Sequence, residues 1–345
     1  MQVTTIGIDL AKEVFQVHGV DGSEKVVLRK QLKRSQVSAF FSVLSPCLIG
    51  MEACGGAHHW ARTLSAYGHT VKLMAPQFVK PYVKSNKNDM RDAEAICEAV
   101  TRPTMRFVPI KSKEQQAVLS LHRGREAFKD MRTSLANRIR GLLQEFGISF
   151  STGISHVFKN APLLLEERAD DLPAPFIQLI GCLFDQFKDV DLQVKKLEKE
   201  IKRLSNKNEA CKRLEEIPGV GPLTSSALVS TIGSAQDFKN GRELSAWLGL
   251  VPRQHSTGGK TVLGRISKRG DGYLRKLLIH GARSALLQIE RKESGGQIKN
   301  LIQRSNKNVA AVALSNKNVR TIWALLAHNR EYRHDYEEIR KYAKA

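Results

Sequence analysis

The chain has 345 residues, 41% of them hydrophobic and 26% charged, which is typical of a globular protein with two or three separate cores. Lysine and arginine total 55 against 34 aspartate and glutamate, so the formal net charge is +21. No apolar stretch of about 18 residues occurs, and no signal-like segment opens the chain, which excludes a membrane-spanning protein. We therefore expect a soluble, cytoplasmic protein without a membrane partner.

The positive charge is distributed unevenly along the chain. Residues 1–100 hold 12 basic and 9 acidic residues, whereas residues 251–330 hold 16 basic and 3 acidic residues. A polyanion such as nucleic acid is the natural partner of such a segment, although a solvated basic surface is the plain alternative. The five cysteines are scattered without a Cys-x-x-Cys pair, which predicts reduced thiols.

Strands alternate with helices in the first part of the chain. From Thr5 the residues predict a strand and a hairpin, and the segment from Ser35 to Leu44 predicts a helix. A short buried strand at Cys47, a helix closed by Gly68 and a further strand at residues 69–76 follow. This order predicts an α/β fold with a mixed sheet, in a domain covering residues 1–105.

The middle of the chain, residues 106–210, is predicted to be a helical linker. An apolar stripe indicates a helix from Glu114 to Phe146, and a Pro-containing connection follows it. A second helix repeats apolar residues with heptad spacing, which is typical of a coiled-coil seam. This seam can close on the first helix or between chains, and we favour the second arrangement, hence a homo-oligomer. The seam residues are Leu183, Phe187, Val190, Val194, Leu197, Ile201 and Leu204.

Four carboxylates are the candidate metal ligands. Asp9 interrupts the apolar strand from Ile6 to Leu10, where an isolated charge is costly unless something compensates it. Glu52 ends a second buried strand, and Asp89 and Asp92 are three residues apart, so they share one helix face. Two Mg²⁺ ions need several such oxygen ligands for phosphodiester chemistry. The alternatives are an acidic first turn for Asp89 and Asp92, and an ion pair with Lys12 or His58 for Glu52.

A mostly helical third domain is predicted for residues 211–330, followed by a polar tail, 331–345. The segment around Pro-Gly-Val-Gly resembles a helix-hairpin-helix, in which Gly219 and Gly221 would let backbone N–H groups approach a phosphate. The alternative is a plain connection between two helices.

A Gly-rich basic loop follows, and it carries an exposed Ser256 that could attack a phosphodiester. A simple turn serine is the alternative, and Tyr273 is the rival nucleophile. The basic residues expected to clamp the phosphate backbone are Arg253, Lys260, Arg265, Lys268, Arg269, Arg275 and Lys276.

The chain also resembles a known family. The segments GIDLAK, GMEACG, NKNDMRDA, EIPGVG and GLVPRQHSTGGK occur in the order seen in IS110 insertion-sequence transposases, with the greatest likeness to their IS1111 branch. This resemblance covers nearly the whole chain. It implies an RNase H-like, RuvC-like N-terminal domain, a coiled coil and a C-terminal transposase domain with a catalytic serine.

The resemblance also assigns residues and partners. The family's DEDD tetrad would be Asp9, Glu52, Asp89 and Asp92, and its serine would be Ser256, with Thr257 as the neighbouring alternative. The expected partners are donor DNA, target DNA and a noncoding guide RNA of the element, in a bacterial, nucleoid-associated setting.

The mechanism expected from these residues is a composite one. Mg²⁺ held by the acids would activate Ser256, giving a covalent phosphoserine and a free hydroxyl before strand exchange. The acids and the serine lie in different predicted domains, so a seam between subunits could bring them together. One rival is a junction resolvase or nuclease that uses water, and another is a non-catalytic nucleic-acid-binding architectural protein.

Overall fold

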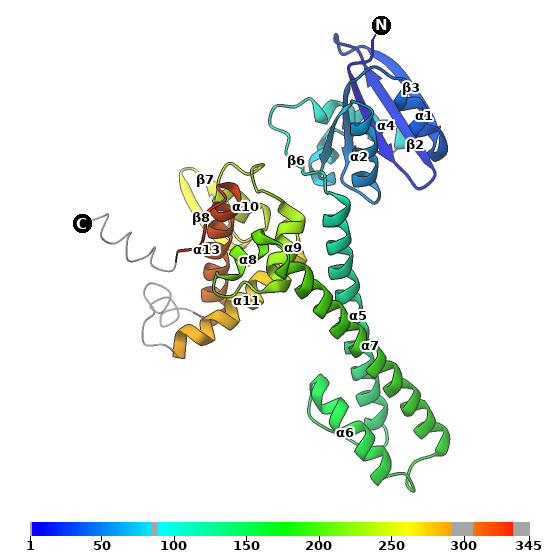
Figure 1. Ribbon diagram of the computed structural model, residues 1–345, viewed down its shortest axis with the longest axis vertical. Helices are drawn as coiled ribbons and strands as arrows, with labels where there is room; N and C mark the ends of the chain where they lie inside the picture. The colour runs from blue at the N-terminus through cyan, green and yellow to red at the C-terminus, as the bar shows by residue number, and fades with distance from the viewer. Residues whose placement is uncertain (1, 85–87, 292–305, 334–345) are drawn as a thin grey trace, which may run out of the picture. The chain divides into compact units, whose positions relative to one another are not determined.

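The computed structural model describes residues 2–84, 88–291 and 306–333 (Figure 1). The chain divides into two compact units, Met1–Lys113 and Glu114–Ala345, and each is described by itself. Most of the predicted polar tail, residues 334–345, lies outside the described residues.

The first unit is built on a six-stranded mixed sheet with the strand order β3-β2-β1-β4-β5-β6. β1 pairs antiparallel with β2 and parallel with β4, and β4 pairs parallel with β5, which confirms the predicted mixed sheet with helices. β6 pairs with β5 through Leu73 and Val108, so the sheet extends past residue 105. The strands are β1 Thr5–Leu10, β2 Val14–Val20, β3 Val26–Lys33, β4 Leu48–Glu52, β5 Thr70–Met74 and β6 Phe107–Val108.

Helices cover both faces of this sheet. Ile6 and Ile8 point from β1 into a core that includes Phe15 and Trp60. The opposite face of β1 meets α4, and at Gly7 an added Cβ atom would lie 2.2 Å from the carbonyl oxygen of Ala93. The glycine therefore allows α4 to lie directly on the strand that carries Asp9. The helical segments are η1 Arg34–Gln36, α1 Val37–Ser42, α2 Ala57–Ala66, α3 Pro76–Val79, η2 Lys80–Tyr82 and α4 Asp89–Val100.

The second unit is mostly helical and contains one β-hairpin. Its helix α6 occupies part of the segment that the sequence suggested was only a Pro-containing connection, with Pro162 inside the helix. The elements are α5 Lys113–Gln144, α6 Ile154–Glu167, α7 Ala174–Asn206, α8 Glu209–Glu215, α9 Pro222–Ile232, α10 Gly241–Trp247, β7 Pro252–Thr257, β8 Lys260–Ile266, α11 Gly272–Arg291 and α13 Lys307–Ala327.

The two long helices α5 and α7 lie side by side as an antiparallel pair (Figure 1). Ion pairs join Arg125 to Glu198 and Arg132 to Asp191, so positions that advance along α5 meet positions that recede along α7. Along the predicted seam of α7, Phe187 and Ile201 are fully buried within the chain. Phe187 shares its core with Ile139 and Leu143 of α5, so this part of the seam packs on the first helix. The coiled coil and self-association stay predictions.

The C-terminal helices α8, α9, α10, α11 and α13 share one apolar core. Within it, α8 and α9 are consecutive helices joined by the Pro-Gly-Val-Gly segment. Gly219 has a φ of 88°, and an added Cβ atom there would lie 2.6 Å from the carbonyl oxygen of Gly281 in α11. The connection between α8 and α9 is thus packed tightly against α11.

All five cysteines are free thiols. Among the described residues, no helix has both the length and the apolarity needed to cross a membrane. The free thiols agree with the expectation from the sequence.

Candidate active site

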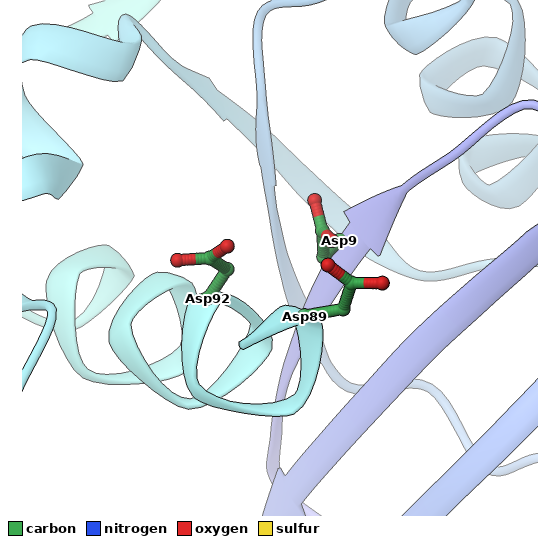
Figure 2. A group of neighbouring side chains, drawn as sticks. All are labelled: Asp9, Asp89 and Asp92. Atoms are coloured by element: carbon green, nitrogen blue, oxygen red, sulfur yellow. The ribbon is translucent and has the colours of Figure 1, made fainter. Parts of the chain in front are cut away.

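Three aspartates converge where β1 ends and α4 begins (Figure 2). Ligand oxygens of Asp9, Asp89 and Asp92 all lie within 4.8 Å of one another. Asp9 and Asp92 are half-buried, and Asp89 is exposed. The structure therefore brings together three of the four predicted acids, one from a strand and two from the first turn of a helix.

Local structure explains why Asp89 and Asp92 are available at this position. The helix α4 is capped by Asn88, whose side chain accepts a hydrogen bond from the backbone N–H of Met90 at 3.1 Å. Because Asn88 fills the capping role, neither aspartate is needed for it. The partial positive charge at the helix N-terminus still favours carboxylates in this turn.

Glu52 is not a member of this close group, although the sheet places it nearby. Ile8 of β1 pairs with Met51 of β4, so Glu52 follows in register beside Asp9. Gly50 contacts α4 through the same sheet face as Gly7, and side chains alternate along a strand, so Glu52 shares a face with Asp9. Both carboxylates act on one neighbour: after partial burial, Glu52 and then Asp9 raise the pKa of the Cys54 thiol.

The donor chemistry of this site fits a divalent cation such as Mg²⁺. Hard cations prefer carboxylate oxygens, and clustered like charges repel one another unless a cation compensates them. The residues that would hold the ion are Asp9, Asp89 and Asp92, and Glu52 is the adjoining fourth acid. Such an ion supplies charge compensation for a phosphoryl group in the transition state.

Ser256 lies on strand β7 and is exposed, as is the whole of that strand. The sequence suggested a loop, but β7 and β8 form a hairpin with a two-residue turn at Gly258 and Gly259, whose φ angles are 54° and 77°. Positive φ at both turn positions matches the right-handed twist of paired strands, and glycine adopts it readily. This turn chemistry was visible in the sequence and was overlooked.

The side chains of Ser256 and Thr257 lie on opposite faces of the hairpin. Alternate side chains of a strand point to opposite faces, so Ser256 shares its face with Gln254 and with its cross-strand partner Thr261. The amide Nε2 of Gln254 donates a hydrogen bond to Ser256 Oγ at 2.8 Å, and the hydroxyl of Thr261 lies 3.4 Å from the same atom. Neither neighbour was predicted from the sequence, although Gln254 is two residues from Ser256 and Thr261 pairs with it across the Gly-Gly turn.

Five of the seven basic residues expected to clamp phosphate are exposed on or beside this hairpin. The other two, Arg275 and Lys276, lie on α11, where Arg275 binds the carbonyl of Leu248 and Lys276 pairs with Glu126. Among the described residues, none of the five hairpin residues takes part in an ion pair that would already neutralise its charge. They are Arg253 on β7, Lys260 and Arg265 on β8, and Lys268 and Arg269 directly after it.

Tyr273, the rival nucleophile, is half-buried near the start of α11. Its hydroxyl lies 2.9 Å from Nδ1 of the buried His122. Burial raises the pKa of this phenol, which disfavours the nucleophilic phenolate. These surroundings favour a structural role for Tyr273.

The two glycines of the predicted helix-hairpin-helix, Gly219 and Gly221, differ in their surroundings. Gly219 is constrained by its contact with Gly281, so packing alone explains why a glycine is required there. At Gly221, the N-cap of α9, an added Cβ atom would have no neighbour within 4 Å. Open space at this helix start is compatible with the predicted approach of a phosphate, which stays a prediction.

Two family models match separate parts of the chain, and both describe transposases. A family model described as "Transposase IS116/IS110/IS902 family" matches residues 211–299, and a second model described as "Transposase", of the DEDD type of IS110 elements, matches residues 6–148. The second match includes all four acids, and the first includes the serine hairpin.

Close relatives are similar over nearly their full length. The chain is 51% identical to a "Probable family 20 transposase" of Pseudomonas aeruginosa, over 96% of this chain and 99% of the relative. It is 45% identical to the transposase for insertion sequence element IS1111A of Coxiella burnetii, over 96% and 92% respectively. It is 42% identical to the transposase for insertion sequence element IS1328 of Yersinia enterocolitica, over 94% and 96%. The chain therefore belongs to the IS116/IS110/IS902 family of transposases.

Proposed function

We propose that this transposase cuts and exchanges DNA strands through a covalent phosphoserine at Ser256, with Mg²⁺ bound by the acids of the first unit. The observation that carries the proposal is the convergence of Asp9, Asp89 and Asp92, with ligand oxygens within 4.8 Å of one another. Carboxylates in this arrangement suit a cation that compensates charge on a phosphate. Glu52 is the fourth ligand of the proposal.

In the cutting step, Ser256 Oγ attacks a phosphodiester phosphorus of DNA. A bond forms between Oγ and phosphorus, and the bond from phosphorus to the departing sugar oxygen breaks. The serine proton goes to solvent, and the departing oxygen takes up a proton and becomes a free strand hydroxyl. In strand exchange, a hydroxyl of the other DNA attacks the phosphoserine and releases Ser256.

The residues around Ser256 support this assignment over Thr257. Gln254 holds the serine hydroxyl through an N–H donor, and the same amide group would suit a charged phosphate oxygen. The exposed arginines and lysines of the hairpin would bind flanking phosphates. A phosphoserine bond made by an exposed side chain leaves the protein core unchanged.

The partners of the proposed reaction are donor DNA, target DNA and a noncoding guide RNA encoded by the element. The basic C-terminal segment supports a polyanionic partner but does not distinguish RNA from DNA. A homo-oligomer, either a dimer or a tetramer, would bring several copies of both sites to the two DNAs. The setting of the reaction is the bacterial nucleoid in the cytoplasm.

The test combines purified protein, Mg²⁺, RNA from the flanking noncoding region and labelled donor and target DNA. The expected product is a covalent protein–DNA adduct under denaturing conditions, lost in Ser256→Ala and in Asp9→Asn. Thr257→Ala is the matched control for the serine because it removes a hydroxyl from the opposite face of β7. Glu98→Gln is the control for the acid because Glu98 lies on α4 in an ion pair with Arg102.

Each outcome decides between reaction types. An adduct that persists in Ser256→Ala would overturn the serine assignment. Cleaved DNA without an adduct would indicate a nuclease that uses water, and binding without cleavage would indicate an architectural protein. An adduct that forms without the RNA would remove the guide from the proposal.

A further inference from the structure

The exposed β7–β8 hairpin joins the rest of the second unit at its two ends, which are hydrogen-bonded to each other. At its base, the backbone N–H of Ser267 donates to the carbonyl of Val251 at 2.8 Å, and that of Lys268 donates to Gly249 at 3.1 Å. An added Cβ atom at Gly249 would lie 2.1 Å from the carbonyl oxygen of Arg269. These contacts, rather than side-chain packing along the ribbon, hold the hairpin.

One side chain of α11 bridges both ends of the hairpin. Nη1 of Arg275 donates to the carbonyl oxygen of Leu248, before β7, at 3.0 Å. The same nitrogen lies 3.4 Å from the carbonyl oxygen of Arg269, after β8. Because the guanidinium group is planar and always charged, it fixes the distance between the two ends better than a flexible ammonium would.

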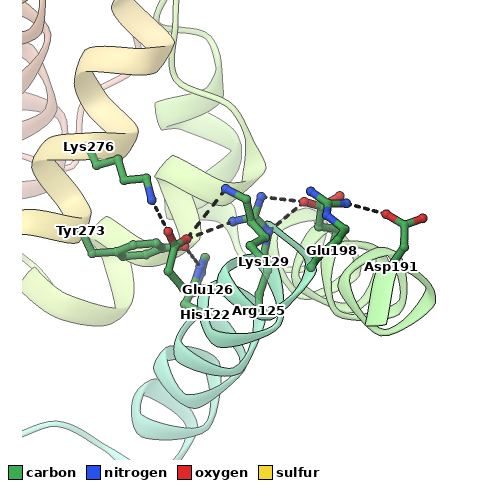
Figure 3. Close-up of polar contacts among 9 residues, drawn as sticks. His122, Arg125, Glu126, Lys129, Asp191, Glu198, Tyr273 and Lys276 are labelled. Carbon is green, nitrogen blue, oxygen red and sulfur yellow. Dashed lines mark hydrogen bonds and ion pairs between the residues drawn. The ribbon is translucent and has the colours of Figure 1, made fainter. Parts of the chain in front are cut away.

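The first turns of α11 are also held against α5 by a buried polar contact between His122 and Tyr273 (Figure 3). His122 of α5 is 1% exposed and lies between the hydroxyl of Tyr273, at 2.9 Å, and that of Ser226 of α9, at 3.0 Å. Beside it, Glu126 of α5 pairs with Lys276 of α11. His122 and Glu126, which are neighbours on one face of α5, thus both bind the first turns of α11.

The proton positions in this contact follow from the partners. Ser226 Oγ lies 2.5 Å from the carbonyl oxygen of Pro222, which only accepts, so the serine proton points there. Burial, and then the charge of Arg125, lowers the pKa of His122 to about 4, so the ring is neutral at pH 7. Its single N–H therefore donates from Nε2 to Ser226, and Nδ1 accepts the O–H of Tyr273. Every polar atom of the His122 ring is satisfied.

We propose that Arg275, together with the Tyr273–His122 pair, positions the serine hairpin by fixing the first turns of α11 against α5 and both ends of the hairpin against α11. None of these residues touches the reacting atoms. This inference rests on the proposed function only for its effect on cutting, because the mechanical role of the residues exists with or without a nucleophile at Ser256.

The experiment uses the variants Arg275→Lys and Tyr273→Phe in the full chain. Arg283→Lys is the matched control, because Arg283 lies on the same helix, is exposed and binds Asn308 instead of the hairpin. Hydrogen exchange in the absence of DNA measures the protection of the Ser267 and Lys268 amides. Adduct formation with DNA, RNA and Mg²⁺ is measured at saturating DNA, together with the DNA dissociation constant.

We expect both variants to exchange these two amides faster and to form the adduct about tenfold more slowly, with unchanged DNA affinity, because small displacements of a nucleophile are costly. Arg283→Lys should match the wild type in each measurement. Thermal unfolding shows whether a variant is folded, and Ser226→Ala replaces Tyr273→Phe if that variant does not fold.

Unchanged exchange at the two amides would overturn the positioning role. Faster exchange with an unchanged rate of adduct formation would also overturn it, because the hairpin would then be loosened without effect on the reaction. A wild-type adduct that is absent, or that maps to another residue, would instead refute the proposed function, and the exchange data would still decide the mechanical attachment.

Discussion

Asp9 and Ser256 both lie on β-strands, but the surroundings of the two strands differ. β1 is a central strand of a six-stranded sheet, with Ile6 and Ile8 fully buried and α4 lying directly on its other face. β7 has a single partner strand, and every one of its residues is exposed. The acids are therefore positioned by a packed core, and the serine is positioned only through the base of its hairpin.

This difference has a mechanistic consequence. A metal site needs its ligand oxygens fixed within fractions of an ångström, which strands and helices in a core provide. A nucleophile that must attack, carry and release a DNA strand needs room around it, which a projecting ribbon provides. Mutations near the acids should therefore affect both stability and activity, whereas mutations on the ribbon should affect activity or DNA binding alone.

The largest expected effect comes from removing one acid. Asp9→Asn should lower the rate of adduct formation on the order of 10³-fold, since a bound metal contributes several kcal/mol to the transition state and each factor of ten corresponds to about 1.4 kcal/mol. Manganese binding followed by electron paramagnetic resonance should weaken in the same variant. Glu98→Gln should change neither, and wild-type activity in Asp9→Asn would separate the acids from the reaction.

Acid should weaken the contact of α5 with α11 through His122. The folded state lowers the pKa of this histidine to about 4 from its ordinary value of 6.5, so the unfolded chain takes up the proton first as pH falls. The contribution of the neutral His122 ring to the free energy of unfolding is fully present above pH 6.5. It is lost as pH falls towards 4, by at most about 3 kcal/mol. His122→Gln should lack this component, so its urea unfolding should depend less steeply on pH. Parallel curves for both proteins would contradict the assignment.

The packing of α4 on β1 can be tested with a single methyl group. In Gly7→Ala the new Cβ atom would meet backbone atoms of α4 at 2.2 to 2.8 Å, so the helix must shift, and the free energy of unfolding should fall by about 1 to 3 kcal/mol. The displaced helix should also weaken manganese binding. Gly141→Ala is the matched control, because an exposed helical glycine with open space should gain up to about 1 kcal/mol on the same substitution. Equal responses at both glycines would contradict the close packing.

Much of this architecture could be predicted from the residues alone. Apolar alternation and turn residues predicted the N-terminal hairpin of β1 and β2 and the mixed sheet. The placement of Asp9 in an apolar strand, with two acids on one helix face, predicted the convergence of these acids. The spacing of Asp89 and Asp92 was informative because helix periodicity places both on one face. The acids could be predicted because they lie at a strand end and a helix start, which local sequence patterns indicate.

The attachment of the serine hairpin was harder to predict because it depends on contacts between distant segments. The contact of His122 with Tyr273 spans 151 positions in the sequence, and no local pattern announces it. Heptad spacing predicts an apolar stripe on α7, but it does not predict which element covers the stripe, because the spacing describes one helix alone. Gly219 was assigned to phosphate binding, whereas its contact with Gly281 gives it a packing role as well.

The smallest expected effect tests whether the ribbon binds DNA through individual charges. Arg265→Gln should leave the free energy of unfolding within about 0.5 kcal/mol of the wild type, because the side chain is exposed and lies outside any core. The slope of log binding constant against log salt concentration should fall by about 1, since one phosphate contact releases about one counterion. Fluorescence anisotropy with labelled duplex DNA at several salt concentrations measures this slope. Lys196→Gln, on the exposed face of α7, is the control of equal charge, and a matching loss there would mean that overall charge rather than the ribbon governs DNA binding.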